Sequence, residues 1–228
     1  MTAPAVSCLI PAFNEAARIG AVLRAVTDHP GIAEVIVIDD GSSDATAQIV
    51  RQTAGVTLIS LPQNRGKTWA LAAGIAAARH PLLLLVDSDL VGLETRHLSA
   101  LIGVVTSGRA DVGISLRQNA PGLWRGIGLD YLSGERILPR AQIAGRIDAL
   151  RQLPKFGFEV FLNRIWIDQN ARIGVVRWPG VHSPSKSAKR GLWPGVQADL
   201  HMMRDIFRTV APAETARQIR AMMRQRVG

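Results

Sequence analysis

The chain is poor in several features that mark particular classes of protein. It has one cysteine, Cys8, in 228 residues, so no disulfide can form within it, and the surrounding apolar run indicates a core residue. Aromatic residues make up 5% of the chain, and no basic helix carries them at intervals, so we do not expect nucleic acid binding. We find no signal peptide pattern and no apolar stretch of membrane-spanning length. We therefore expect a cytoplasmic protein, either free or peripheral at the inner membrane face.

Two common nucleotide-binding motifs are also missing. The residues that follow the first expected strand, Pro11–Glu15, lack the G-x-G-x-x-G of a dinucleotide-binding fold. Gly66-Lys67-Thr68 resembles the end of a phosphate-binding P-loop, but Leu61 stands where that motif needs its first glycine. A nucleotide would have to be held by other means.

Charge is distributed unevenly between the two halves of the chain. Residues 1–114 carry 8 Lys and Arg against 10 Asp and Glu, a net charge of −2, and residues 115–228 carry 19 against 8, a net charge of +11. A basic half of this size favours an anionic partner, such as a substrate phosphate or a lipid phosphate, although solvated surface accounts for part of it.

Apolar runs alternate with segments of helical periodicity through the first half. The expected strands are Val6–Ile10, Glu34–Ile38, Val56–Ser60, Leu82–Val86, Asp111–Leu116 and, later, Ile173–Trp178. The expected helices are Ala16–Asp28, Ala45–Ala54, Thr68–Arg79, Thr95–Thr106 and Phe158–Asn170, with C-terminal helices interrupted near Pro212. This alternation predicts an α/β protein with a doubly wound, mostly parallel sheet flanked by helices, followed by a less regular, basic C-terminal half.

Two acidic residues follow the most apolar of these strands. The run Leu82–Val86 has no polar alternation, which is typical of a strand buried on both faces, and Asp87-Ser88-Asp89 follows it. Ligands of open α/β sheets bind at the carboxyl ends of the strands. Hard divalent cations take oxygen ligands and often bridge to substrate phosphates. The pair therefore suggests a metal and phosphate site, and the alternative is a solvated turn.

Lys67 stands at the start of an expected helix, where a cation opposes the helix dipole. Stability does not explain it there, whereas an anion bound at the helix start would. Asp39 and Asp40 end the second expected strand, and either a nucleotide contact or a helix cap would account for them. Asp44 is expected to cap the helix that follows.

Six segments together resemble glycosyltransferase family 2, whose fold is named GT-A. They are SCLIPAFNE (7–15), VIVIDDGSSD (35–44), NRGKTWA (64–70), LLVDSD (84–89), DYLSGER (130–136) and GFEVFL (157–162). The last two are similar to the polyprenol-phosphate and phosphoglycerate sugar transferases of this family. The resemblance implies one GT-A domain over residues 1–228, with a nucleotide-sugar-binding half (1–116) and an acceptor-binding half (117–228).

The resemblance also implies roles for individual residues. Metal ligands would be Asp89, Asp87 and His182, for Mg²⁺ or Mn²⁺. The donor would be bound by Pro11, Ala12, Asn14, Glu15, Asp40, Lys67, Asp87, Ser88, Lys189 and Arg190. Catalytic roles would fall to Asp130 or Glu159 as acid or base and to Arg136 as a fork for phosphate. Inverting and retaining chemistry both stay open.

The expected function is metal-dependent transfer of a sugar from a nucleoside diphosphate, UDP in preference to GDP, to an anionic acceptor. That acceptor is either a polyprenyl phosphate, with Leu200–Arg226 lying on a membrane, or a small phosphorylated molecule, with the same region packed on the α/β domain. Peripheral membrane contact and a homodimer are further options. The alternatives are a sugar-phosphate nucleotidyltransferase and a non-catalytic module that binds nucleotide sugars or membranes.

Overall fold

The computed structural model describes residues 5–153, 157–184 and 211–227. The strands are β1 (Val6–Ala12), β2 (Ile32–Asp39), β3 (Val56–Ser60), β4 (Leu82–Leu85), β5 (Val112–Arg117), β6 (Arg136–Pro139), β7 (Ile173–Trp178) and β8 (Arg226–Val227). The α-helices are α1 (Ile19–Thr27), α2 (Thr46–Arg51), α3 (Lys67–Ala77), α4 (Thr95–Thr106), α5 (Gly122–Ile127), α6 (Ile147–Arg151), α7 (Gly157–Asp168) and α9 (Pro212–Gln225). Two short 3-10 turns, Arg140–Gln142 and Ala144–Arg146, follow β6.

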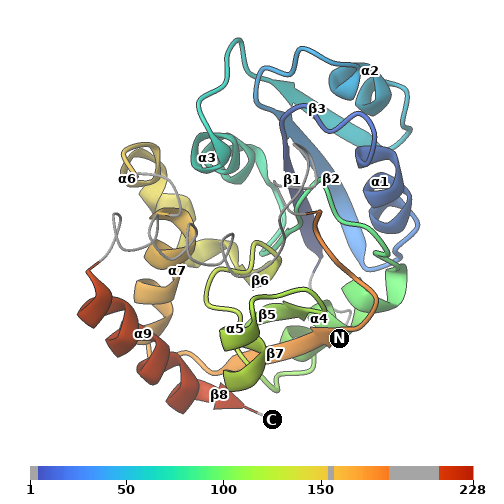
Figure 1. Cartoon of the computed structure of the whole chain (residues 1–228). Helices are drawn as coiled ribbons and strands as arrows, with labels where there is room; N and C mark the ends of the chain where they lie inside the picture. Colours follow the sequence, from blue (N-terminus) through green and yellow to red (C-terminus); the bar gives the residue numbers. More distant parts are fainter. Residues whose placement is uncertain (1–4, 154–156, 185–210, 228) are drawn as a thin grey trace.

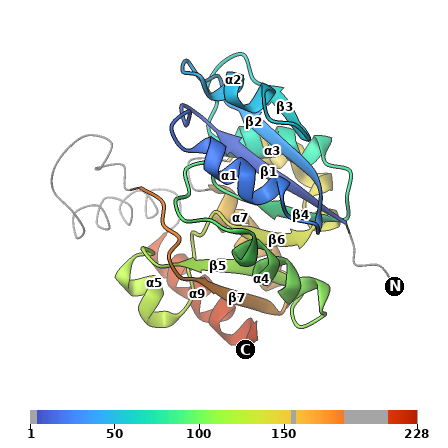
Figure 2. The same cartoon turned by 90° about the vertical axis from the view of Figure 1, so that its right-hand side faces the viewer.

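The strands form one mixed sheet in the order β3-β2-β1-β4-β6-β5-β7-β8. Figure 2 shows this order running from β3 and β2 at the top of the view to β7 at the bottom. The pairs among β3, β2, β1 and β4 are parallel, as are those among β5, β7 and β8, whereas β6 runs antiparallel to both β4 and β5. The predicted doubly wound, mostly parallel α/β fold is therefore confirmed.

The sequence patterns did not predict β6, which lies near the centre of the sheet. Its four residues, Arg136–Pro139, begin with a charge and end with a proline, so they show neither an apolar run nor alternation. β6 matters for the site because Leu85 pairs with Arg136. The residues before β6, Gly134 and Glu135, are therefore carried alongside those that follow β4, which include Asp87.

Two apolar cores cover the two faces of the sheet, because successive side chains of a strand point to opposite faces. Leu9, Leu83 and Leu85 pack with α3, α7 and α9 in one core, and Cys8 and Leu84 pack with α1 and α4 in the other. Figure 1 shows α1 on one side of the strands and α3 and α7 on the other. Cys8 is fully buried and burial raises the pKa of its thiol, so the predicted core role is confirmed.

The C-terminal helix α9 begins at Pro212 and packs against the first of these cores. Ile219, Met222 and Met223 contact it, while Arg217, Arg220 and Arg224 are exposed. For the described residues, the prediction that the apolar side chains of the C-terminal region pack on the α/β domain is therefore confirmed. Leu200, Met203 and Phe207 lie outside the described residues. No helix of the described ranges combines the length and apolar character that crossing a bilayer requires.

Glu34 gives the amino-terminal edge of the sheet a dependence on pH. Its carboxylate accepts hydrogen bonds from Ser7 Oγ at 2.5 Å and from Arg79 Nε at 2.7 Å. Burial opposes ionisation, but these partners hold the pKa of Glu34 below its ordinary value. The stabilisation from Glu34 is therefore complete above the ordinary glutamate pKa and is lost as pH falls through the lowered folded-state pKa.

We expect Glu34→Gln to lower the thermal midpoint at pH 7, and we expect the difference from wild type to shrink as the pH falls below the ordinary glutamate pKa. The measurement is the midpoint of both proteins between pH 7 and pH 3. A difference that stays constant across this range would show that the Glu34 charge does not contribute in the way described.

Candidate active site

Charged residues from three separate segments meet beyond the carboxyl end of β4. Lys67 is the first residue of α3, Asp87 lies two residues after β4, and Glu159 lies in the first turn of α7. Lys67 Nζ is 2.7 Å from Asp87 Oδ1 and 3.2 Å from Glu159 Oε1. Two carboxylates of the protein thus face Lys67 at the start of this helix, and its contact with a donor phosphate stays a prediction.

The electrostatics of this group keep Lys67 and Asp87 charged. Burial would lower the pKa of Lys67, but the charges of Asp87 and Glu159 hold it above its ordinary value. Burial would likewise raise the pKa of Asp87, but the charges of Lys67 and Arg117 hold it below its ordinary value. Asp87 is therefore a fixed negative charge beside a fixed positive one.

A second cation, Arg117, ends β5 and faces two further carboxyl groups. Its Nε is 3.4 Å from Glu135 Oε2, and its Nη2 is 3.8 Å from Asp130 Oδ2. The charge of Glu135 raises the pKa of Arg117 further above its already high value. Burial raises the pKa of Asp130. The sequence had singled out Asp130 but neither Arg117 nor Glu135.

Glu135 is fully buried and is held by two serines. Its Oε2 accepts hydrogen bonds from Ser115 Oγ at 2.7 Å and from Ser133 Oγ at 3.0 Å. Burial raises the pKa of Glu135, Arg117 opposes this in part, and the Asp87 charge adds to the rise. Its Oε1 has no hydrogen-bond partner among the residues that the structure describes. Glu135 therefore lies between the positive charge of Arg117 and the negative charge of Asp87.

Gly134 brings the backbone of this loop against the charged group. A Cβ placed on Gly134 would lie 2.5 Å from Asp87 Oδ2 and 2.6 Å from Lys67 Nζ. Any side chain there would have to displace the carboxylate or the ammonium. The glycine of Ser133-Gly134-Glu135 is therefore needed for space.

The loops after β1 and β2 are tied to one another by their polar side chains. Asn14, which has a positive φ of 54°, accepts a hydrogen bond through Oδ1 from the Ser43 N–H, and the Asn14 N–H donates to Ser42 Oγ. Asp44 accepts hydrogen bonds from the N–H groups of Ala16 and Thr46, but Ala45, not Asp44 as predicted, is the N-cap of α2. Glu15 pairs with Arg18 at 3.1 Å. The predicted residues of both loops therefore share one rim.

Asp40 is buried and connects this rim to α3. Its two carboxylate oxygens accept hydrogen bonds from the N–H groups of Arg65 at 2.9 Å and of Gly66 at 2.7 Å. Pro11 and Ala12 are buried in β1, which extends two residues beyond its predicted end and pairs Ala12 with Asp39. Asp40 thus orders the chain before Lys67, and its role as a base contact stays a prediction.

Asp89 is linked to the segment that carries His182. Asp89 Oδ2 accepts a hydrogen bond from Ser183 Oγ at 2.8 Å, and Val91 pairs with His182 in an antiparallel bridge. This places the His182 segment beside the D-x-D, as a shared role requires. Ser88, between the two acids, is buried.

The donor set at the D-x-D suits a hard divalent cation, because Asp87 and Asp89 offer carboxylate oxygens. Within the ranges that the structure describes, no three His, Cys, Asp or Glu side chains form a ready-made cluster. Mg²⁺ in nucleotide-dependent enzymes is usually held by one or two carboxylates together with substrate phosphates. The residues present fit that kind of site.

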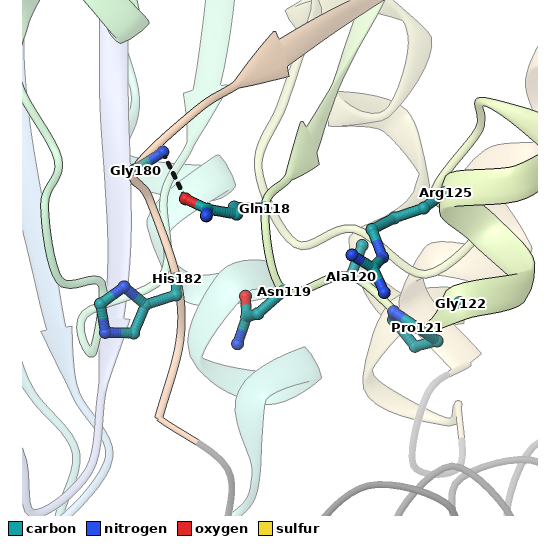
Figure 3. A pocket seen from close by; sticks show the side chains of 8 residues that line it. All are labelled: Gln118, Asn119, Ala120, Pro121, Gly122, Arg125, Gly180 and His182. Atoms are coloured by element: carbon teal, nitrogen blue, oxygen red, sulfur yellow. Dashed lines mark hydrogen bonds between the residues drawn. The ribbon is translucent and has the colours of Figure 1, made fainter.

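An open pocket of about 740 Å³ lies beside the segment that carries His182. It is lined by Gln118, Asn119, Ala120, Pro121, Gly122, Arg125, Gly180 and His182. Figure 3 shows Arg125 entering from α5 on one side, His182 on the other, and Gln118 hydrogen-bonded to the Gly180 N–H. Asn119 also donates to the Ser183 carbonyl at 2.7 Å. The pocket lining therefore combines four polar side chains with apolar and glycine residues.

Arg136 does not occupy the position that the sequence suggested. Its side chain is fully buried, and it donates hydrogen bonds to the carbonyls of Ser133 and Tyr131 and to Asn163 Oδ1. The guanidinium also lies over the Trp166 ring, 5.0 Å from its centroid. The predicted fork for phosphate is corrected: Arg136 is engaged inside the protein. Lys189 and Arg190 lie outside the described residues.

A family profile and individual related sequences both point to glycosyltransferases. Residues 7–161 match the profile of Glycosyl transferase family 2. The dodecaprenyl-phosphate galacturonate synthase of Rhizobium johnstonii is 33% identical over 117 residues, which is 42% of this chain and 35% of the relative. The dolichyl-phosphate beta-glucosyltransferase of Dictyostelium discoideum is 35% identical over 98 residues, 36% of this chain and 30% of the relative. The chain thus aligns with about a third of each of these relatives.

Comparison with solved structures supports the fold. Glucosyl-3-phosphoglycerate synthase from Mycobacterium tuberculosis, crystallised with Mn²⁺, UDP and glucosyl-3-phosphoglycerate, superposes with a TM-score of 0.67 and 22% identity. The match covers 97% of this chain and 80% of that one. The profile match spans well over half of the sequence and the topology agrees. The chain therefore belongs to glycosyltransferase family 2.

Proposed function

We propose that this protein transfers a sugar from a nucleoside diphosphate, UDP in preference to GDP, to a phosphorylated acceptor. The observation that carries the proposal is the meeting of Asp87, Lys67 and Glu159 beyond β4, with Asp89 tied to the His182 segment. A divalent cation would be attracted by the carboxylates of this group, and a diphosphate would be attracted by the ammonium group of Lys67. The relation to a synthase crystallised with Mn²⁺ and UDP supports the same donor chemistry.

In this proposal Asp89 and Asp87 hold Mg²⁺ or Mn²⁺, with His182 close by. When bound, the ion neutralises the departing diphosphate and so makes it a better leaving group. Lys67 leaves its pairing with Asp87 and Glu159 in part to contact the diphosphate, and Asp40 and the Asn14 loop contact the nucleoside. Glu159 is the preferred general base, because it contacts Lys67 in the group that also contains Asp87. Asp130 is buried and faces Arg117 instead.

The experiment that tests donor binding is thermal denaturation with UDP or GDP, each with and without Mn²⁺. A ligand that binds only the folded state raises the melting temperature. At a ligand concentration a hundred times its dissociation constant, the free energy of unfolding rises by about 2.7 kcal/mol. We expect UDP with Mn²⁺ to stabilise most, and UDP without metal to stabilise little.

Calorimetry of Asp40→Ala then tests the nucleotide placement. We expect UDP binding to weaken by about 1–3 kcal/mol, the scale for losing a hydrogen bond to a charged group. The matched control is Asp168→Ala, which removes an exposed carboxylate at the end of α7. In the thermal denaturation experiment, equal stabilisation by every nucleotide, with or without metal, would contradict the proposal.

The acceptor is proposed to enter the pocket lined by His182 and Arg125. Arg125 offers a planar cation suited to phosphate, and Asn119 and Gln118 offer polar groups beside it. Arg125 thus takes the place that the sequence had given to Arg136. A phosphate headgroup fits this lining whether it belongs to a small molecule or to a polyprenyl chain.

We expect Arg125→Gln to raise the KM for a phosphorylated acceptor about tenfold, because a charge-assisted contact is lost, while UDP affinity stays unchanged. Steady-state kinetics with phosphoglycerate and with a short polyprenyl phosphate measure this and identify the acceptor class. Arg146→Gln, an exposed arginine remote from the pocket lining, is the control. An unchanged KM for both acceptors would exclude Arg125 from acceptor binding.

Two alternatives make different predictions. A sugar-phosphate nucleotidyltransferase would release pyrophosphate from a nucleoside triphosphate and a sugar phosphate. A non-catalytic module would bind UDP-sugars with Mn²⁺ but leave them intact. Following the fate of the nucleotide by chromatography separates both from sugar transfer, which releases the nucleoside diphosphate only when the acceptor is present.

A further inference from the structure

Two cations divide four carboxyl groups between them around the D-x-D. Lys67 contacts Asp87 and Glu159, while Arg117 faces Glu135 and Asp130. The Lys67 contacts lie on the side where a donor would bind. The side chain of Arg117 is 15% exposed and its two partners are 3% and 0% exposed. Arg117 therefore faces the interior of the protein.

Arg117 and Glu135 are joined by the geometry of β5. Ser115 and Arg117 are two residues apart on this strand, so their side chains leave the same face. Ser115 hydrogen-bonds Glu135 Oε2 while Arg117 Nε approaches the same oxygen at 3.4 Å. Arg117 Nε has no hydrogen-bond partner of its own among the described residues, so its role toward Glu135 is that of a buried counter-charge.

Glu135 is in turn joined to Asp87 by the pairing of β4 with β6. Because Leu85 pairs with Arg136 in antiparallel register, Glu135 and Gly134 continue beside Val86 and Asp87. Gly134 has no side chain to separate the two carboxyl groups, and a Cβ there would collide with Asp87. Arg117 thus faces Glu135, and the loop that carries Glu135 lies against Asp87.

From this arrangement we propose that Arg117 is a positioning residue: it holds Glu135 in place, and Glu135 fixes the Asp87 carboxylate for the donor and its metal. The inference rests on the proposed function and deepens it, since it assigns work at the D-x-D to a residue that touches neither substrate nor metal. Partners behind a metal-binding carboxylate typically contribute 10–100-fold to metal affinity or activity.

The test is a double-mutant cycle with Arg117→Met, Glu135→Gln and the double variant in the full chain. We expect Arg117→Met to lower both Mn²⁺ affinity in the presence of UDP and kcat by about 10–100-fold, with the KM for the acceptor changed less than threefold. Glutamine carries no charge that would need Arg117 opposite it, and its amide can donate a hydrogen bond to Asp87. The double variant should therefore recover at least a third of the loss on a logarithmic scale.

Controls keep this test decisive. Arg177→Met, an exposed arginine on the neighbouring β7, should leave Mn²⁺ affinity and kcat unchanged. If Arg117→Met does not fold, Arg117→Lys keeps the charge, and its smaller loss should vanish in the Glu135→Gln background. Mn²⁺ affinity is measured by titration with an electron paramagnetic resonance readout, independently of turnover.

The outcomes separate this inference from the proposed function. Additive losses in a protein that binds UDP and Mn²⁺ would overturn the positioning role and indicate that Arg117 acts on a ligand directly. A tenfold or larger rise in acceptor KM alone would overturn it in the same way. Wild-type protein that binds neither UDP nor Mn²⁺ would overturn the proposed function and this inference together.

Discussion

Asp89→Asn should lower kcat for sugar transfer by about a thousandfold while the protein stays folded. The change keeps the size of the side chain but removes the charge proposed to bind the divalent ion. Electrostatic stabilisation of a leaving diphosphate by a metal contributes several kcal/mol to the barrier, and each 1.4 kcal/mol corresponds to about tenfold in rate. Initial rates at saturating donor and acceptor, with Mn²⁺ in excess, measure the effect.

The matched control is Asp111→Asn. Asp111 precedes β5 at the opposite end of the sheet, where it pairs with Arg172 at 2.8 Å in an exposed position. We expect this variant to transfer sugar at the wild-type rate. Undiminished transfer by wild-type protein in EDTA, or by Asp89→Asn itself, would refute a metal role for the D-x-D.

Arg136→Met should lower the free energy of unfolding by about 3–5 kcal/mol, the scale for disrupting a buried charged network. Methionine fills part of the arginine volume but donates no hydrogen bond. The carbonyls of Ser133 and Tyr131 lose their guanidinium donors, and so does Asn163 Oδ1. Urea denaturation monitored by circular dichroism gives the change.

Arg146→Gln again serves as the comparison, because that arginine is exposed and should shift stability by less than about 0.5 kcal/mol. The same experiment distinguishes the two roles considered for Arg136. A variant that unfolds at the wild-type urea concentration but no longer binds a phosphorylated acceptor would restore the original reading of Arg136 as a phosphate fork.

The parts of the fold that the sequence predicts are those governed by local patterns. Leu82–Leu85 is apolar throughout and forms a buried strand, and Thr95–Thr106 forms a helix with the predicted bounds. β6 escaped prediction because its place between β4 and β5 comes from long-range pairing. α5 and α6 are only six and five residues long, too short for helical periodicity to show.

The site residues likewise fall into those that local sequence patterns predict and those that only long-range contacts reveal. Asp87 and Lys67 end or begin regular elements, so their positions could be inferred from the carboxyl edge of the sheet. Glu135 and Arg117 resemble ordinary surface charges in the sequence, because nothing local shows that Ser115 and Ser133 enclose them. Arg136 was misplaced for the same reason: a buried arginine and an exposed one look alike until their partners are known.

The position of β6 has a consequence for how the chain folds. β6 joins β4 to β5, both of which are made before it, so the two parts of the sheet cannot unite until residues 136–139 have been synthesised. Until then β4 presents an unpaired edge, the kind of surface that promotes misassembly. We expect a nascent chain that ends before β6 to depend on chaperones. It would also lack the pairing of Leu85 with Arg136, which sets the Gly134–Glu135 segment beside Asp87.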